Sequence, residues 1–289
     1  MTNSKAIAER DSPRKVMVVV APVSHSPRAE IQNPTSPEEV AEAVLACAEA
    51  GAGMVHLHVR DAHGNLTDKP DVFRRTLDLI CRRSAIVIQG STGGTPAGGI
   101  GDLSQDERAG GLLDERVEAG SLNMGSVNMG DDPYINSGSE IRAWAALMHE
   151  KGIRPELEIF EAGMLETVRK MAAAGQIGPP FVCGVVAGLS LPATPEVLCF
   201  VKSLLPAEAL WGVIHHHMPD FLLSITALGM GATFVRVGFE DGIHYAPGRI
   251  AKTNAELVRR VGEVIRGLGF ELATPDEART LLSLRNRPK

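Results

Sequence analysis

The fold is decided by three consecutive segments, VMVVVA at residues 16–21, PEEVAEAVLACAEAG at residues 37–51 and MVHLHVR at residues 54–60. The first and third segments are short and rich in Val, which is typical of buried strands. The middle segment has helical periodicity, with Ser36 in place to cap its start and Gly51 where a helix ends. A strand, a helix and a second strand in this order predict one unit of a parallel sheet.

The same alternation continues to the end of the chain. We expect strands at 16–21, 54–60, 85–89, 121–124, 156–160, 181–186, 209–214 and 234–238. We expect helices at 37–50, 71–83, 114–119, 139–151, 164–174, 195–205, 221–230, 254–268 and 275–284. With 289 residues, this α/β chain fits a single closed (β/α)8 TIM barrel better than an open doubly wound sheet, because such barrels typically need about 250 residues. We therefore expect one TIM-barrel domain over residues 1–289, with a flexible N-terminal segment at 1–13.

Composition excludes several classes of protein. A net charge of −6 and a pI near 5.9 argue against a nucleic-acid partner. No apolar run reaches the roughly 18 residues of a membrane helix, and the run at 16–23 is too short and wrongly flanked for a signal peptide. The four cysteines form no CxxC pair, so we expect reduced thiols in a cytoplasmic protein.

Two histidines close the second expected strand. His56 and His58 are two residues apart and therefore point to the same side. Aimed into the barrel mouth, they are either half of a metal site or a pair held by hydrogen bonds. Glu240, beyond the eighth strand, reaches the same cavity in a closed barrel. Two histidines and one carboxylate leave a fourth position open, as in catalytic zinc sites, although the same set also accepts Fe²⁺, Co²⁺ or Mn²⁺.

Arg236 lies two residues before Gly238 and four before Glu240, so it also faces inward. A buried guanidinium needs an anionic partner, and Asp241 or a substrate carboxylate is available. The alternative is a purely structural ion pair between Arg236 and Asp241 at the barrel mouth.

The remaining strand ends carry hydroxyls, amides and acids. Glycines in Ser91-Thr92-Gly93-Gly94 allow a ligand to approach the backbone, and the hydroxyls can donate to a carboxylate or an oxyanion. Ser121 and Asn123 share an inward face, and Glu156 and Glu158 point together, into the barrel or onto its helical shell. We expect one histidine of His215-His216-His217 to face the ligand.

Six motifs in order resemble those of the β-keto acid cleavage enzyme family, whose named member is the 3-keto-5-aminohexanoate cleavage enzyme. The resemblance covers nearly the whole chain, and HLHVRD together with RVGFED is its most specific part. The motifs are HLHVRD at 56–61, QGSTGG at 89–94, SLNMGSVNMG at 121–130, ELEIFEAGM at 156–164, RVGFED at 236–241 and KTNAELV at 252–258.

The resemblance implies a zinc-dependent retro-Claisen reaction, in which a β-keto acid and acetyl-CoA give acetoacetate and a new acyl-CoA. It further implies one Zn²⁺ per subunit and a homo-oligomer, either a dimer or a tetramer. By motif position, the metal ligands are His56, His58 and Glu240. The catalytic residues are Asp241, Arg236 and Ser91, and the substrate-binding residues are Ser121, Asn123, Thr92, Gly93, Gly94 and Glu158.

Two loops depart from the family pattern. The named member carries a glutamate near the position of Ser26 that suits an amino group, and this chain has none there. The loop at 215–217 is rich in histidine. Together with His25, this loop predicts a polar or anionic β-keto acid rather than an aminated one. The alternatives are another metal-dependent carbon–carbon lyase or aldolase that does not use CoA, and a non-catalytic binding barrel, which would need neither Asp241 nor an open metal position.

Overall fold

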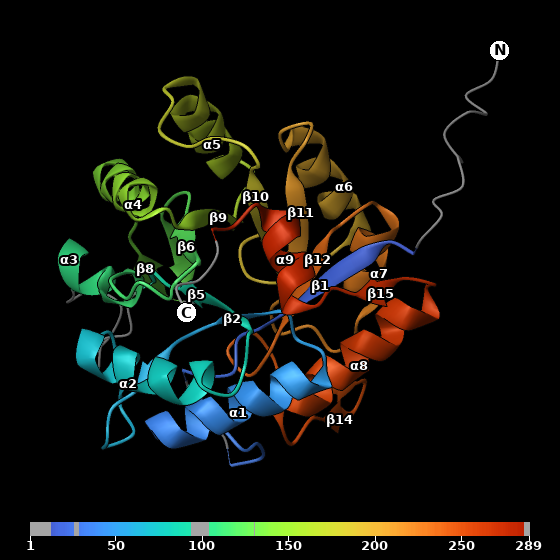
Figure 1. The fold of residues 1–289 in the computed structure, drawn as a ribbon. Helices are drawn as coiled ribbons and strands as arrows, with labels where there is room; N and C mark the ends of the chain where they lie inside the picture. The colour runs from blue at the N-terminus through green and yellow to red at the C-terminus, as the bar shows by residue number, and fades with distance from the viewer. Residues whose placement is uncertain (1–12, 26–28, 94–103, 130, 286–289) are drawn as a thin grey trace.

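The structure is a computed structural model that describes residues 13–25, 29–93, 104–129 and 131–285. Eight parallel strands form a sheet, and pairing of the last with the first closes it into a barrel (Figure 1), so the predicted (β/α)8 fold is confirmed. The barrel strands are β1 (Lys15–Val20), β2 (Met54–His56), β5 (Val87–Gly90), β6 (Ala119–Asn123), β9 (Arg154–Ile159), β10 (Val182–Ala187), β11 (Leu210–His215) and β12 (Phe234–Val237). The short strand β15 (Glu271–Leu272) pairs with the start of β1.

Helices surround the barrel (Figure 1). The helices are α1 (Pro37–Ala50), α2 (Pro70–Cys81), α3 (Gln105–Arg108), α4 (Gly138–Lys151), α5 (Met164–Ala173), α6 (Pro195–Leu204), α7 (Leu222–Gly229), α8 (Asn254–Gly267) and α9 (Pro275–Leu282). Among the described residues, α1, α3, α4, α6, α8 and α9 begin at a Ser or Thr cap. Hydroxyls at the N-caps accept backbone N–H groups, as Ser36 does from Glu39, which stabilises the exposed first turns. Within the described residues, no helix has both the length and the apolar character needed to cross a membrane.

The helix expected at 114–119 is wrong. Asp114 accepts hydrogen bonds from the backbone N–H and the guanidinium of Arg116, which fixes a turn, and Ala119 already begins β6. The helical residues before β6 lie earlier, in α3 and the 3₁₀ turn Gly110–Leu112. Ser104 and Glu107 form the capping box that starts α3.

Three β-hairpins extend the carboxyl ends of barrel strands, where active sites of such barrels lie. The second expected strand, 54–60, is interrupted after His56 and resumes in the first hairpin. The hairpins pair β3 (Val59–Arg60) with β4 (Leu66–Thr67), β7 (Val127–Met129) with β8 (Asp132–Tyr134), and β13 (His244–Ala246) with β14 (Arg249–Ile250).

The barrel interior is apolar at one end and polar at the other. At the amino-terminal end, Met17 of β1 and Phe234 of β12 are paired in register, and Ala278 and Leu282 of α9 belong to the same apolar cluster. Helix α9 therefore closes this end. Further along β2, β5, β6, β9 and β12, the inward side chains are polar and include His56, Gln89, Ser121, Glu156 and Arg236. The side chains capable of binding or catalysis therefore lie at the carboxyl ends of the strands.

Gly184 of β10 provides the space that the polar layer needs. A Cβ atom at this position would lie 2.3 Å from Oε1 of the buried Glu156. We predict that Gly184→Ala lowers the free energy of unfolding by about 1–3 kcal/mol, because the carboxylate has little room to move. Gly163→Ala, where a Cβ would meet nothing within 4 Å, is the matched control. Equal urea denaturation midpoints for the two variants would contradict the prediction.

Candidate active site

A cavity of about 110 Å³ opens at the carboxyl ends of the strands. Its polar lining comes from elements far apart in the sequence, because adjacent strand ends converge there. It is lined by His25, His56, His58, Ser91, Gly93, Asn123, Met129, Tyr134, Glu158, Phe160, Val186, Ile214, His216, Arg236, Glu240 and Asp241.

Two imidazoles and a carboxylate converge at one side of this cavity. Nε2 of His56 lies 3.2 Å from Nε2 of His58 and 3.4 Å from Oε1 of Glu240, and Nε2 of His58 lies 3.6 Å from Oε2 of Glu240. A tetrahedral ion with bonds of 2.0–2.1 Å separates its ligand atoms by about 3.3–3.4 Å. The three distances are close to this value, with each imidazole nearest to a different oxygen of the Glu240 carboxylate.

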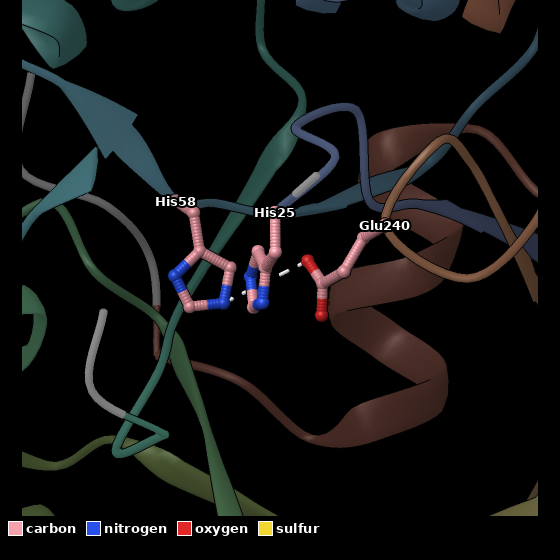
Figure 2. Close-up of side chains that lie close together, drawn as sticks. All are labelled: His25, His58 and Glu240. Atoms are coloured by element: carbon pink, nitrogen blue, oxygen red, sulfur yellow. Dashed lines mark ion pairs between the residues drawn. The ribbon is translucent and has the colours of Figure 1, made fainter. Parts of the chain in front are cut away.

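A third imidazole reaches the same place. Ligand atoms of His25, His58 and Glu240 all lie within 4.8 Å of one another. Figure 2 shows the three side chains turned toward one another, with His25 between the other two in this view. His25 lies on the loop after β1 and is exposed. It stands at the solvent side of the cluster, where the sequence predicted an open fourth position.

A buried polar chain orients His56. Its Nδ1 lies 2.8 Å from Oε1 of Gln89, and Nε2 of Gln89 donates to the carboxylate of Glu156. Because Glu156 takes the amide N–H, the amide oxygen faces His56 and requires a proton on Nδ1. In the neutral ring with this proton, Nε2 of His56 carries the lone pair that can bind a metal ion. Such a partner behind the ring is usual for metal-binding histidines.

Arg236 connects the carboxylates of the site. Its Nε and Nη2 bind both oxygens of Asp241 at 2.8 and 2.9 Å, its Nη1 binds Glu158 at 2.8 Å, and its Nη2 binds Glu240 at 2.5 Å. Burial opposes its charge, but the surrounding acids outweigh burial and hold the pKa of Arg236 well above its usual value. Burial raises the pKa of Glu158 to about 7 despite this arginine. The guanidinium is occupied by protein groups and positions them.

Negative charge exceeds positive charge in this buried site. Glu156, Glu158, Glu240 and Asp241 are all acids, whereas Arg236 is the one guanidinium among the described residues that line the cavity. Oε2 of Glu240 is buried and has no hydrogen-bond partner within the described part of the chain. An unpartnered carboxylate oxygen beside two imidazoles is a suitable ligand set for a divalent cation.

Comparison with known proteins identifies the family. A model of the beta-keto acid cleavage enzyme family matches residues 15–284. The chain belongs to this family. The resemblance read from the six motifs is thereby confirmed.

Individual members of the β-keto acid cleavage enzyme family align over almost the whole chain. The 3-keto-5-aminohexanoate cleavage enzyme of Fusobacterium nucleatum is 33% identical over 274 residues, covering 93% of this chain and 98% of the relative. The 3-oxoadipate:acetyl-CoA acetyltransferase of Cupriavidus necator is 32% identical, covering 93% and 94%. A structure of ObcA in ternary complex with a C4-CoA adduct and oxalate matches with a TM-score of 0.76 at 21% identity, covering 87% of this chain and 67% of that one, which supports the fold.

Not every predicted substrate-binding residue faces the cavity. Ser91, Gly93, Asn123 and Glu158 line it. By contrast, the Thr92 hydroxyl is fully buried and donates to the backbone oxygen of Ser121. Ser121 is also fully buried, and its hydroxyl donates to Oγ of Ser91 at 3.3 Å. Thr92 and Ser121 therefore support the residues in front of them. Gly94 lies outside the described residues.

The three consecutive histidines at 215–217 lie in different surroundings. His215 is buried, with Nε2 2.5 Å from the backbone oxygen of Asp220 and its ring stacked on Phe221. His216 lines the cavity, and His217 is exposed with a positive φ of 51°. His216 is thus the member of the run that faces the ligand position.

Sequence reasoning assigned no role to Gln89 and did not single out Tyr134. Gln89 precedes Ser91 by two residues on the same strand face, so the alternation used elsewhere could have found it. Tyr134 sits on the β7–β8 hairpin, whose position over the cavity no strand periodicity indicates.

We predict that Arg236→Met destabilises the protein by about 3–5 kcal/mol, since it leaves three buried carboxylates without their counter-charge. The free energy of unfolding from urea denaturation measures the effect. Arg169→Met is the control, because Arg169 makes two short bonds to Glu166 on the exposed surface, where little stability depends on them. An Arg236→Met protein as stable as this control would contradict the prediction.

Proposed function

We propose that this protein is a zinc-dependent β-keto acid cleavage enzyme that converts a β-keto acid and acetyl-CoA into acetoacetate and a new acyl-CoA. The observation that carries the proposal is the convergence of His56, His58 and Glu240 beside an arginine-bound Asp241 in one cavity. The family membership supplies the reaction class. The name of the Cupriavidus necator relative supports acetyl-CoA as the co-substrate.

The proposed metal ligands are His56, His58 and Glu240, with His25 beside the fourth position. A divalent ion held there would act as a Lewis acid toward the ketone oxygen of the substrate. Zinc is the ion we propose because two imidazoles and one carboxylate form a usual catalytic zinc set. Gln89 and Glu156 contribute by fixing the orientation of the His56 ring.

The protein side chains account for the proton transfers. Asp241 takes a proton from the methylene carbon between the ketone and the carboxylate, and Arg236 holds Asp241 in position. The resulting carbanion attacks the thioester carbonyl of acetyl-CoA, and CoA leaves as the thiolate. The thiolate attacks the original ketone carbon, the carbon–carbon bond breaks, and acetoacetate recovers the proton from Asp241. The acyl group remains on CoA. Ser91 donates a hydrogen bond to the substrate during these steps.

We further propose a polar or anionic group at the far end of the β-keto acid. His25 and His216 both line the cavity and can donate hydrogen bonds to such a group. The acids among the described lining residues, Glu158, Glu240 and Asp241, all bind Arg236. Arg236 binds Glu158 and Asp241, and the oxygen of Glu240 that remains unpartnered is assigned to the metal ion, which disfavours a cationic substrate.

We propose a cytoplasmic homo-oligomer, a dimer or a tetramer, consisting of single-domain chains. Large apolar side chains of the adjacent helices α6 and α7 support association, since Phe200, Leu204 and Leu222 are 56%, 46% and 66% exposed. No disulfide joins any of the four cysteines, which is typical of a reducing compartment.

An assay of purified enzyme with a panel of β-keto acids, with and without acetyl-CoA, tests the proposal. We expect acetoacetate and a new acyl-CoA to form only when acetyl-CoA is present, and fastest with substrates that carry a polar or anionic end. Cleavage without acetyl-CoA would favour a metal-dependent aldolase or lyase instead. Turnover of cationic substrates alone would overturn the proposed selectivity.

Asp241→Asn tests the proposed base with little change in shape. We predict a loss of kcat of at least about 100-fold, as is usual when a general base is removed. Melting temperature and metal content serve as controls for folding and for the neighbouring ligand Glu240. Unchanged turnover in a folded, metal-containing variant would refute the role of Asp241.

A further inference from the structure

Tyr134, at the end of β8, lines the cavity and has no role in the mechanism above. It is one of only two tyrosines in the chain and is 3% exposed. Its side chain lines the same cavity as Ser91 and Asn123, and its hydroxyl lies 2.9 Å from Nδ2 of Asn123. A buried phenol that faces a ligand cavity needs partners for its oxygen and for its proton.

Protein groups fill the accepting side of this hydroxyl. Nδ2 of Asn123 donates to it at 2.9 Å, and Nη2 of Arg108 lies 3.4 Å away. Arg108 is itself fixed, because it donates to the backbone oxygens of Thr92 and Ile135 at 3.0 and 2.9 Å. It also donates to Asn136 Oδ1, and its guanidinium lies 4.4 Å from the ring centre of Trp144.

Among Tyr134, Asn123 and Arg108, one hydrogen-bonding proton near the cavity has no acceptor in this chain of contacts. A phenol oxygen accepts two hydrogen bonds and donates one, so with Asn123 and Arg108 as donors the proton of Tyr134 is directed elsewhere. If the Asn123 amide is rotated, its oxygen accepts from Tyr134 and its NH₂ becomes the spare donor. In the first arrangement the spare donor is the phenol O–H, and Oδ1 of Asn123 has no partner within the described residues. In the second arrangement the spare donor is the NH₂ group of Asn123, and both side chains line the cavity. Burial raises the pKa of Tyr134, so the phenol keeps its proton.

Ser91 shows the same pattern on the other side of Gly93. Its Oγ accepts from the N–H of Gly93 at 2.8 Å and from Ser121 Oγ at 3.3 Å, which leaves its own proton for a ligand. A Cβ atom on Gly93 would lie 3.0 Å from Ser91 Oγ and 3.2 Å from Tyr134 Oη. The absence of a side chain at Gly93 therefore keeps open the space next to both hydroxyls.

We propose that Tyr134 is a substrate-binding residue whose hydroxyl, oriented by Arg108 and Asn123, pairs with Ser91 to hold the carboxylate of the β-keto acid. Two converging donors suit the two oxygens of a carboxylate. The ketone oxygen belongs to the opposite side of the cavity, with His56 and His58. This assignment rests on the proposed function, since it takes the ligand to be a β-keto acid.

Calorimetric titration with acetoacetate tests the assignment without turnover, because this product carries the same ketone and carboxylate. We expect Tyr134→Phe, which removes the hydroxyl and keeps the ring, to weaken acetoacetate binding roughly 10- to 100-fold. Tyr245→Phe is the matched control, since the second tyrosine packs against Arg249 outside the cavity, and it should bind like the wild type. In steady-state kinetics, Tyr134→Phe should raise KM for the β-keto acid and leave KM for acetyl-CoA unchanged.

The outcomes separate this assignment from the proposed function. A wild-type protein that does not bind acetoacetate refutes the proposed function and the assignment with it. A wild type that binds and a Tyr134→Phe protein that binds equally well refute the assignment alone. If Tyr134→Phe does not fold, Gly93→Ala decides, because its added methyl group would fill the space beside both hydroxyls. Wild-type acetoacetate affinity in Gly93→Ala would then overturn the proposal.

Discussion

The guanidinium of Arg236 is the interaction on which the rest of the site depends. It binds Glu158 on β9 and both Glu240 and Asp241, which follow β12. Ionised carboxylates this close repel one another, and the shared guanidinium offsets that repulsion inside the protein. The one positive charge does not balance them, and Glu156 adds a further acid below. The arrangement therefore holds a proposed base and a proposed metal ligand in fixed places and leaves room for a second cation.

The barrel accommodates these buried charges because its interior is divided into an apolar layer and a polar layer of side chains. Apolar side chains and α9 close the amino-terminal end, so the polar layer lies on a layer of packed apolar side chains. Within the polar layer, side chains are hydrogen-bonded to one another, as in the chain from Glu156 through Gln89 to His56. The β7–β8 hairpin then closes over the cavity with Tyr134, which Arg108 anchors to the loop after β5. A substrate bound as proposed would meet fixed hydrogen-bond donors on one side and the imidazole–carboxylate cluster on the other.

Much of this could be predicted from the sequence, for a physical reason. Strand alternation places residues two apart on one face, so the inward positions of His56, Arg236 and Asn123 follow from spacing alone. What spacing cannot show is the path of loops. The Asp114–Arg116 turn replaced an expected helix because a side chain competed for the backbone. The Thr92 hydroxyl donates to the backbone oxygen of Ser121 instead of facing the cavity. Tyr134 reaches the cavity from the β7–β8 hairpin and His25 from the loop after β1, and barrel-strand spacing gives the path of neither segment.

We propose that the buried acids around His56, His58 and Glu240 serve to bind one divalent ion. Metal content of the purified protein, measured by inductively coupled plasma mass spectrometry after reconstitution with Zn²⁺, tests it most directly. We expect one ion per chain, lost in His58→Ala and in Glu240→Ala and retained in His217→Ala, which changes an exposed histidine of the run at 215–217. A folded wild-type protein that takes up no ion, or a Glu240→Ala protein that keeps a full complement, would contradict it.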